Sequence, residues 1–337
     1  MFKKLGMILM VFLFLIVVGC QSESSSSENE SGKKVSIRLA HGGDPVHPWN
    51  SAAEKFAEQV KEESNGEIEV QIFTAGQMGS DREMLESTQS GALEMSVIST
   101  MAMSGFEPYL QIFDLPYLFP DYESAYSILD GEIGNKVSEK LVSKGLRNMA
   151  YWENDFRQLS NSTKVIDSID DLNGMKIRVP ETPILISWLE NLNAVPTPIA
   201  YTELYTSLQQ GIVEGQDNGI FLSHSAKYYE VQDYYTLTNH IYAPAAFLIN
   251  ESFYQGLTDK HKEIIEKATT DARDYQRQLN ADLRDERLQE MKDAGLQVTE
   301  LSAEALEEFR TSAKEVYEDM KDVIDYDLLQ EILAQTK

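Results

Sequence analysis

The chain has 337 residues, a formal net charge of −26 and a single cysteine. Such an acidic chain lacks the basic surface of a nucleic-acid binder, and one cysteine excludes both a disulfide framework and a Cys-based metal site. An anionic ligand would then have to be held by a few well-placed arginines.

The N-terminal segment is typical of an export signal. Lys3 and Lys4 precede an apolar run over residues 5–18, which is short for a transmembrane helix and indicates a signal peptide over residues 1–19. The following Cys20 completes a sequence that resembles the lipid-attachment motif of bacterial lipoproteins. We therefore expect Cys20 to carry acyl chains such as palmitate and to anchor the protein to a membrane without spanning it. The alternative is an ordinary signal peptide followed by an incidental cysteine.

A serine-rich tether follows the cysteine. Residues 21–34 contain serine and acidic residues but no apolar side chain, which predicts a flexible spacer over residues 20–34. A lipid and a tether suit a protein on the outer face of a single-membrane bacterium better than a periplasmic one. The remaining stretch of about 300 residues is long enough for two lobes of ordinary domain size.

Strands and helices alternate along most of the chain. In chain order, the apolar spacing predicts a strand over 35–39, a helix over 51–60, a strand over 68–73, a helix over 82–89 capped by Asp81, a strand over 93–98, a pair of helices ending at 144 and a strand over 146–152. A second series follows, with strands over 156–159, 176–179 and 212–213 and helices over 184–191 and 202–210. This alternation predicts an α/β fold with parallel strands.

A long helix is predicted near the C-terminus. Residues 259–294 contain no proline and no internal glycine and are rich in helix-forming residues. About 25 helical residues span roughly 37 Å, which is longer than one lobe needs. We expect this helix to bridge both lobes, with two helices separated by a kink as the alternative.

Sequence motifs of catalysis are absent. The chain has no nucleophile elbow, no metalloprotease motif, no P-loop and no dinucleotide-binding motif. Its histidines are scattered without metal-ligand spacing. We therefore expect neither an enzyme nor a cofactor.

Four ordered segments carry a resemblance to a known family. They are residues 151–162 (YWENDFRQLSNS), 174–180 (GMKIRVP), 196–205 (PTPIAYTELY) and 208–218 (LQQGIVEGQDN). Together they resemble the extracytoplasmic solute receptors of tripartite ATP-independent periplasmic (TRAP) transporters, in the dicarboxylate-receptor branch. The resemblance extends from residue 35 to about residue 256 and is weaker in the helical tail.

This resemblance implies an arginine–carboxylate clamp. In the family, the arginine of the Lys-Ile-Arg-Val-Pro strand pairs with the ligand carboxylate, and in this chain it is Arg178. Because Ile177 and Val179 alternate with it, Arg178 is expected to project into a cleft while they face the core. A planar guanidinium matches a carboxylate with two parallel hydrogen bonds. The alternative is a surface arginine paired with an acidic neighbour.

The family pattern implies further ligand contacts, each with an alternative. Arg157 is the second arginine near the ligand, and its alternative is a salt bridge at a strand start. Asn218 would offer its amide to the ligand, although residues 217–219 (DNG) are also a strong hairpin-turn signal. For the remaining expected contacts, the alternative is core packing or helix capping; these residues are His41, Asp81, Ser99, Trp152 and Tyr201. Tyr201 would wall the pocket, and Trp152 would offer an apolar face to a sugar ring.

One position departs from the family pattern. Relatives carry glycine after the asparagine of the Trp-Glu-Asn segment, where this chain has Asp155. Aspartate tolerates a positive φ better than most residues, so we expect the turn to survive.

The resulting expectation is an α/β, two-lobe clamshell of the periplasmic-binding-protein kind, with a long helix bridging the lobes. Lobe I is expected to comprise residues 35–154 and about 243–283, and lobe II residues 155–242 and about 284–337. The lobes would close over the solute by hinge motion.

The resemblance implies a receptor that delivers a small organic acid to a permease of small and large integral membrane subunits. We expect a sugar acid such as a hexuronate first and a C4-dicarboxylate second, bound by a monomer. Two alternatives remain open: the receptor of an ATP-driven importer, and a lipid-anchored enzyme acting on acidic saccharides.

Overall fold

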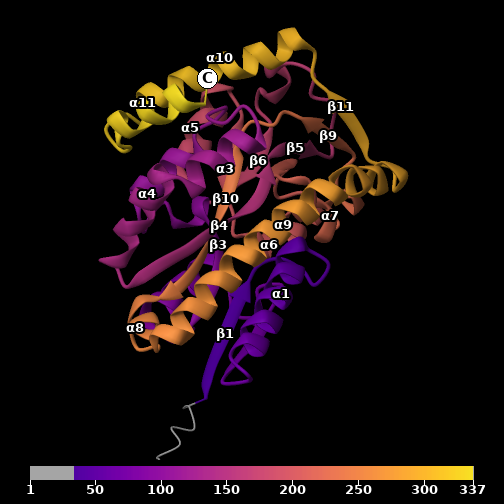
Figure 1. Ribbon diagram of the computed structural model, residues 1–337. Coiled ribbons are helices and arrows are strands. Elements are labelled where there is room, and N and C mark those ends of the chain that lie inside the picture. Colours follow the sequence, from indigo (N-terminus) through magenta and orange to yellow (C-terminus); the bar gives the residue numbers. More distant parts are fainter. Residues whose placement is uncertain (1–33, 337) are drawn as a thin grey trace, which may run out of the picture. The chain divides into compact units, whose positions relative to one another are not determined.

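Two mixed β-sheets organise residues 34–336, the part of the chain that the computed structural model describes (Figure 1). The predicted signal peptide, Cys20 and the tether up to residue 33 lie outside these residues. Within residues 34–336, no helix combines the length and the apolar character that crossing a bilayer requires.

The first sheet has the strand order β2-β1-β3-β10-β4. Its strands are β1 (Val35–His41), β2 (Ile68–Phe73), β3 (Met95–Ser99), β4 (Leu146–Phe156) and β10 (Tyr242–Asn250). β1 runs parallel to β2 and β3, whereas β10 is antiparallel to both β3 and β4. Alternate residues of the strands face opposite sides, so Ile37 and Phe247 join one buried cluster while Ala40 and Leu248 join another.

The second sheet has the strand order β11-β9-β5-β8-β6-β7. Its strands are β5 (Gln158–Asn161), β6 (Lys176–Val179), β7 (Val195–Pro198), β8 (Gly215–Asn218), β9 (Tyr234–Leu237) and β11 (Gln297–Glu300). We call the part built on the first sheet lobe I and the part built on the second sheet lobe II.

Helices surround both sheets (Figure 1). They are α1 (Pro48–Glu63), α2 (Asp81–Ser90), α3 (Tyr122–Asp130), α4 (Glu132–Val142), α5 (Pro183–Asn191), α6 (Tyr201–Gln209), α7 (Ile220–Ser225), α8 (Glu251–Gln255), α9 (Asp259–Asp293), α10 (Ala303–Asp319) and α11 (Tyr326–Gln335). Short 3₁₀ turns lie at η1 (Thr100–Met103), η2 (Pro108–Asp114), η3 (Ile169–Leu172) and η4 (Tyr228–Glu230).

The chain crosses between the two sheets beside Arg157. This residue separates β4 of the first sheet from β5 of the second. Its backbone N–H donates to the Ile241 carbonyl at 2.8 Å, and its carbonyl accepts from the His240 N–H at 3.3 Å. The segment that returns from β9 to β10 therefore lies beside the segment that leads from β4 to β5. These two neighbouring segments place Arg157 between the lobes.

The long helix α9 connects both lobes, as predicted. It is continuous over 35 residues, so the alternative of two helices separated by a kink is wrong. Its first half buries Ile265 and Ala268 in the core of lobe I, and Met291 near its end packs with Tyr235 of lobe II. Figure 1 shows α9 in orange, and it contacts α1, β4 and α7.

Two sequence predictions are corrected by the structure. The N-cap of α2 is Ser80, which forms a capping box with Glu83, so Asp81 is the first helical residue and its side chain is free for another role. The strand expected over 212–213 is wrong, because the strand at this place is β8 (Gly215–Asn218). The proposed lobe boundaries stay a prediction.

Candidate ligand-binding site

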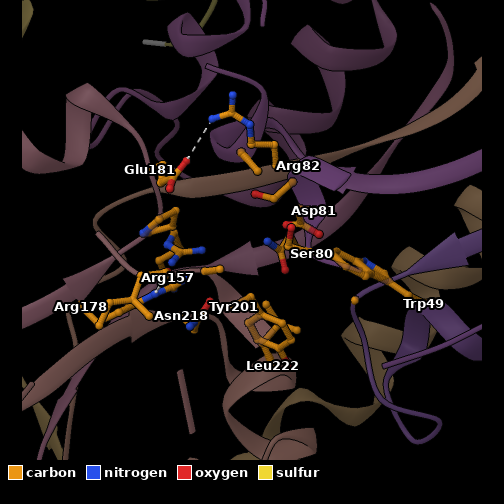
Figure 2. Close-up of a pocket in the computed structure, with 17 residues that line it drawn as sticks. Trp49, Ser80, Asp81, Arg82, Arg157, Arg178, Glu181, Tyr201, Asn218 and Leu222 are labelled. Carbon is orange, nitrogen blue, oxygen red and sulfur yellow. Dashed lines mark hydrogen bonds and ion pairs between the residues drawn. The ribbon is translucent and has the colours of Figure 1, made fainter. Parts of the chain in front are cut away.

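A cavity of about 130 Å³ lies where segments of both lobes meet the crossing (Figure 2). Lobe I contributes the loop after β1, the start of α1 and of α2, the end of β3 and η1. Lobe II contributes β6 and the turn after it, the start of α6, the end of β8 and α7. The lining residues are Gly42, Trp49, Ser80, Asp81, Arg82, Ser99, Ala102, Asn154, Arg157, Arg178, Pro180, Glu181, Ile199, Ala200, Tyr201, Asn218 and Leu222.

Arg178 projects from β6 into this cavity. Its neighbours Ile177 and Val179 are buried in the core, as the strand alternation predicts. Arg178 is 2 % exposed, and among residues 34–336 its side chain donates one hydrogen bond, from Nε to the Ile199 carbonyl at 2.8 Å. Burial lowers the pKa of Arg178 from its ordinary value, which reflects the cost of holding its charge away from water. Its two terminal nitrogens make no hydrogen bond within residues 34–336.

Arg157 is held by an internal counter-ion. Its Nε donates to the Asp217 carboxylate, and its Nη2 donates to the Asp217 carbonyl at 2.6 Å. Burial works to raise the pKa of Asp217, but the Arg157 guanidinium outweighs it and holds that pKa below its usual range. Arg157 therefore both lines the cavity and makes the salt bridge that we named as its alternative role. Its charge is largely balanced, whereas no carboxylate of the described residues forms an ion pair with Arg178.

Unsatisfied polar atoms face the same space. Ser99 Oγ and Asn154 Oδ1 are buried and have no hydrogen-bond partner among the described residues. Asn218 uses its Nδ2 to donate to Gln216 Oε1 at 2.6 Å. A buried acceptor or hydroxyl without a partner is costly, and a polar solute in the cavity would remove that cost.

The lobe I wall carries an indole ring and a carboxylate. Trp49 donates from Nε1 to the Glu153 carbonyl at 2.9 Å, which fixes its ring beside the cavity. Burial raises the pKa of Asp81 to about 6, and the nearby Arg178 partly opposes this shift. At the edge, Arg82 Nη1 of lobe I lies 3.8 Å from Glu181 Oε2 of lobe II, as the dashed line in Figure 2 shows.

Six of the eight sequence-predicted binding residues line the cavity: Asp81, Ser99, Arg157, Arg178, Tyr201 and Asn218. His41 does not line it and is buried behind it, with its ring centroid 6.4 Å from that of Trp49. Trp152 is also absent from the lining and packs in the core of lobe I, 4.7 Å from Phe247 between ring centroids. The binding roles of all eight residues stay predictions.

Asn154 and Trp49 are among the lining residues that sequence reasoning missed. Asn154 stands inside the first family segment and was not singled out. Trp49 follows Pro48 directly after the first loop, and this Pro-Trp pair at a helix start was the available signal. Trp49 places an indole ring at the cavity on the lobe I side, whereas Trp152, to which we assigned an apolar face for a sugar ring, is not among the lining residues.

Comparison with known proteins places this architecture in a family. The model of bacterial extracellular solute-binding proteins, family 7 (DctP), matches residues 39–322. This chain belongs to the DctP family. The resemblance inferred from the four sequence segments is therefore confirmed, and the members of this family are solute-binding proteins.

Three relatives show how close the similarity is. The C4-dicarboxylate-binding periplasmic protein DctP of Rhodobacter capsulatus is 32 % identical over 305 residues, which cover 89 % of this chain and 90 % of the relative. The sugar acid binding protein DctPAm of Advenella mimigardefordensis, solved with galactonate, has a TM-score of 0.88 and 34 % identity, covering 90 % of this chain and 98 % of that one. A TRAP periplasmic solute-binding protein of Polaromonas sp. JS666, solved with D-erythronate, has a TM-score of 0.86 and 30 % identity, covering 89 % and 99 %.

The turn expected at Asp155 is present in the structure. Asp155 has a φ of 67°, so the prediction that aspartate tolerates a positive φ here is confirmed. Its carboxylate accepts hydrogen bonds from the Phe156 and Ile220 N–H groups, both at 2.9 Å, and from the Tyr122 hydroxyl at 2.6 Å. It also lies 3.4 Å from Arg284 Nε of α9. Asp155 thus links β4, α3, α7 and α9 directly beside the cavity.

Proposed function

We propose that this DctP-family chain is the solute receptor of a TRAP-type secondary transporter and captures a small organic acid through Arg178. The observation that carries the proposal is a buried guanidinium that faces a cavity without a carboxylate partner among the described residues. A buried charge in that state needs an opposite charge, and a planar fork suits a carboxylate. Related proteins that bind galactonate, D-erythronate or C4-dicarboxylates support this ligand class.

The expected solute is a sugar acid, such as a hexuronate, with a C4-dicarboxylate as the second choice. Trp49 and Tyr201 offer aromatic faces, while Ser99 and Asn154 offer hydroxyl and amide groups. A solute that combines a carboxylate with hydroxyls and C–H faces matches this mixture. No cofactor takes part in this function.

Capture is proposed to end in closure of the two lobes over the solute. Both lobes line the cavity, and the chain crosses between them at Arg157 and again at residues 238–241. Hinge closure about these crossings would bring Trp49 and Asp81 toward Arg178. The closed monomer would then deliver the acid to the small and large integral membrane subunits of the transporter.

The receptor is proposed to work outside the cytoplasm on a lipid anchor. The apolar run over residues 5–18, Cys20 and the serine-rich tether support an acylated N-terminus on the outer face of a single-membrane bacterium. The mass of the mature protein purified from its membrane tests this point. An acylated Cys20 at the N-terminus is expected, and an unmodified cysteine would contradict the anchor.

Calorimetry tests the receptor function. The compact unit beginning at Lys34 is titrated with hexuronates, aldonates and C4-dicarboxylates, beside Arg178→Ala. Micromolar binding corresponds to about −8 kcal/mol, and loss of the buried charge pair should remove at least about 2 kcal/mol of it. Arg310→Ala is the matched control, because Arg310 is exposed on α10, away from the cavity.

The outcomes separate the rival functions. Saturable binding of an acid that is recovered unchanged and is lost only in Arg178→Ala supports the receptor. Conversion of the acid would instead indicate an enzyme. If no acid binds, or if Arg178→Ala binds as tightly as the parent, the arginine clamp is wrong.

A further inference from the structure

The two lobes touch each other beside the cavity. Ser104, which follows η1 of lobe I, donates a hydrogen bond from Oγ to the Glu181 carbonyl of lobe II at 2.9 Å. The Glu181 side chain also faces Arg82 of lobe I across 3.8 Å, as Figure 2 shows. The structure therefore has the lobes in contact, which is the arrangement that would enclose a solute.

A third contact between the lobes involves a residue without a side chain. Residues 74–79 form the turn between β2 and α2 in lobe I, and this turn lies against the start of α6 in lobe II. A Cβ atom added to Gly76 would lie 2.8 Å from Thr202 Cγ2. Carbon atoms that are not bonded pack at about 3.5–4.0 Å, so a methyl group at position 76 does not fit while the lobes are in contact.

The turn that carries Gly76 is fastened to the core of lobe I. The Ala75 N–H donates to the Gly43 carbonyl at 2.8 Å, and the Gly76 N–H donates to the His41 carbonyl at 3.3 Å. The turn leads directly into the start of α2, which lines the cavity. Because of these connections, the turn cannot move aside without displacing part of the cavity wall.

The partner atom on α6 is also restrained. Thr202 is the second residue of this helix, and a β-branched side chain in a helix has few allowed rotamers. Its neighbour Tyr201 lines the cavity, so α6 cannot shift without moving a second part of the wall. Separation of the lobes is therefore the simplest way to make room for a side chain at position 76.

We propose that Gly76 is a positioning residue that permits the lobes to close fully, and that its contact with Thr202 limits the escape of bound solute. This inference rests on the receptor function proposed above and identifies one contact on which tight capture depends. In an open receptor, the turn and α6 would lie apart, so a methyl group at position 76 would meet Thr202 only on closure. Such a change lowers the population of the closed form, and the affinity for the solute falls by the same factor.

Three substitutions separate closure from local strain. Gly76→Ala also places its Cβ 3.2 Å from the Gly79 carbonyl oxygen and puts alanine at a φ of 66°, but both effects lie within lobe I and act whether the lobes are open or closed. Gly211→Ala is the matched control, because Gly211 has the same φ of 66° and an added Cβ would have no neighbour within 4 Å. Thr202→Ala removes Cγ2 from the contact and leaves the strain at position 76 unchanged.

Calorimetry and stopped-flow kinetics test the proposal with whichever acid the parent binds most tightly among hexuronates, aldonates and C4-dicarboxylates. Gly76→Ala is expected to bind at least about tenfold more weakly, mainly through faster dissociation. Gly211→Ala should bind within about twofold of the parent, since the change lies outside any contact between the lobes. Combining Thr202→Ala with Gly76→Ala should restore the affinity to within about threefold of Thr202→Ala alone, which strain at position 76 would not do.

A second variant covers the case in which Gly76→Ala does not fold, as judged by circular dichroism. Thr202→Phe enlarges the same contact from lobe II without touching the turn, and it should also weaken binding. Unchanged affinity in a folded Gly76→Ala, or in Thr202→Phe if only that variant folds, overturns the role of Gly76. A loss in Gly76→Ala that Thr202→Ala does not relieve also overturns this role. Both results leave the receptor function standing, whereas failure of the parent to bind any of the acids would overturn the receptor function itself.

Discussion

Replacing Asp155 by glycine has two opposing effects on the free energy of unfolding. A left-handed backbone costs an L-residue about 1–2 kcal/mol, and less for aspartate, so Asp155→Gly should relieve about 1 kcal/mol at φ 67°. The same change removes an acceptor of three hydrogen bonds, from the Phe156 and Ile220 N–H groups and the Tyr122 hydroxyl. Hydrogen bonds to charged groups contribute about 1.5 kcal/mol or more each, so the hydrogen bonds outweigh the strain.

We expect Asp155→Gly to lower the free energy of unfolding by about 3 kcal/mol, measured by urea denaturation of the unit beginning at Lys34. Asn193→Gly is the matched control for the backbone effect. Asn193 has a φ of 56°, is exposed, and its side chain makes no hydrogen bond among the described residues, so its replacement should be neutral or slightly stabilising. If the Asp155→Gly protein is as stable as the parent, the Asp155 carboxylate does not stabilise the segment where the chain crosses between the lobes.

Two further predictions concern charge. Burial raises the pKa of Asp114 to about 7, although a hydrogen bond from Thr100 opposes the shift, so the folded protein retains a proton that the unfolded chain releases near pH 4. The stabilising contribution of the Asp114 carboxyl is complete below about pH 4 and is lost as the pH rises to about 7. In urea titrations, the free energy of unfolding of Asp114→Asn should therefore exceed that of the parent by more at pH 7 than at pH 4. A difference that does not vary with pH would contradict this. Glu181→Gln breaks the exposed contact with Arg82, so calorimetry at low salt should show less than about a fivefold loss of affinity, and none at high salt. A large loss that salt does not alter would mean that Glu181 contacts the solute directly.

The parts of the fold that sequence reasoning predicted are those with regular apolar spacing. The strand over residues 68–73 matches β2, and the helix over 259–294 matches α9 within one residue. In each case the buried face repeats with the period of the element, so the pattern and the structure have the same physical cause.

Sequence reasoning failed at β8 because that strand is buried and polar. Gly215–Asn218 contains no apolar side chain, so the strand was predicted at the neighbouring apolar residues Ile212 and Val213 instead. The strand is stabilised by side-chain pairs that join distant segments, including Gln216 with Ser160 and Asp217 with Arg157. Such partners are visible only after folding, and they overrode the turn tendency of residues 217–219.

The candidate site was predictable where the family segments reached it. The motifs pointed to Arg178 and Asn218, which line the cavity. Trp152 does not line the cavity, because residue type alone does not reveal which side of a strand faces the core, and its ring packs against Phe247. The ion pair between Arg157 and Asp217 could not be predicted from the sequence, because these residues are 60 positions apart.

The strand order of the first sheet has a consequence for how the chain acquires its structure. β10 lies between β3 and β4, although 85 residues separate the end of β4 from the start of β10. A chain that emerges from its N-terminus therefore leaves two strand edges of lobe I uncovered until residue 250 is available. Lobe I can reach its final pairing only late, with contacts of high sequence separation, which slows folding. The signal peptide is proposed to direct this chain across a membrane. Late pairing of β10 would keep lobe I unfolded, and therefore able to cross, until most of the chain has been exported.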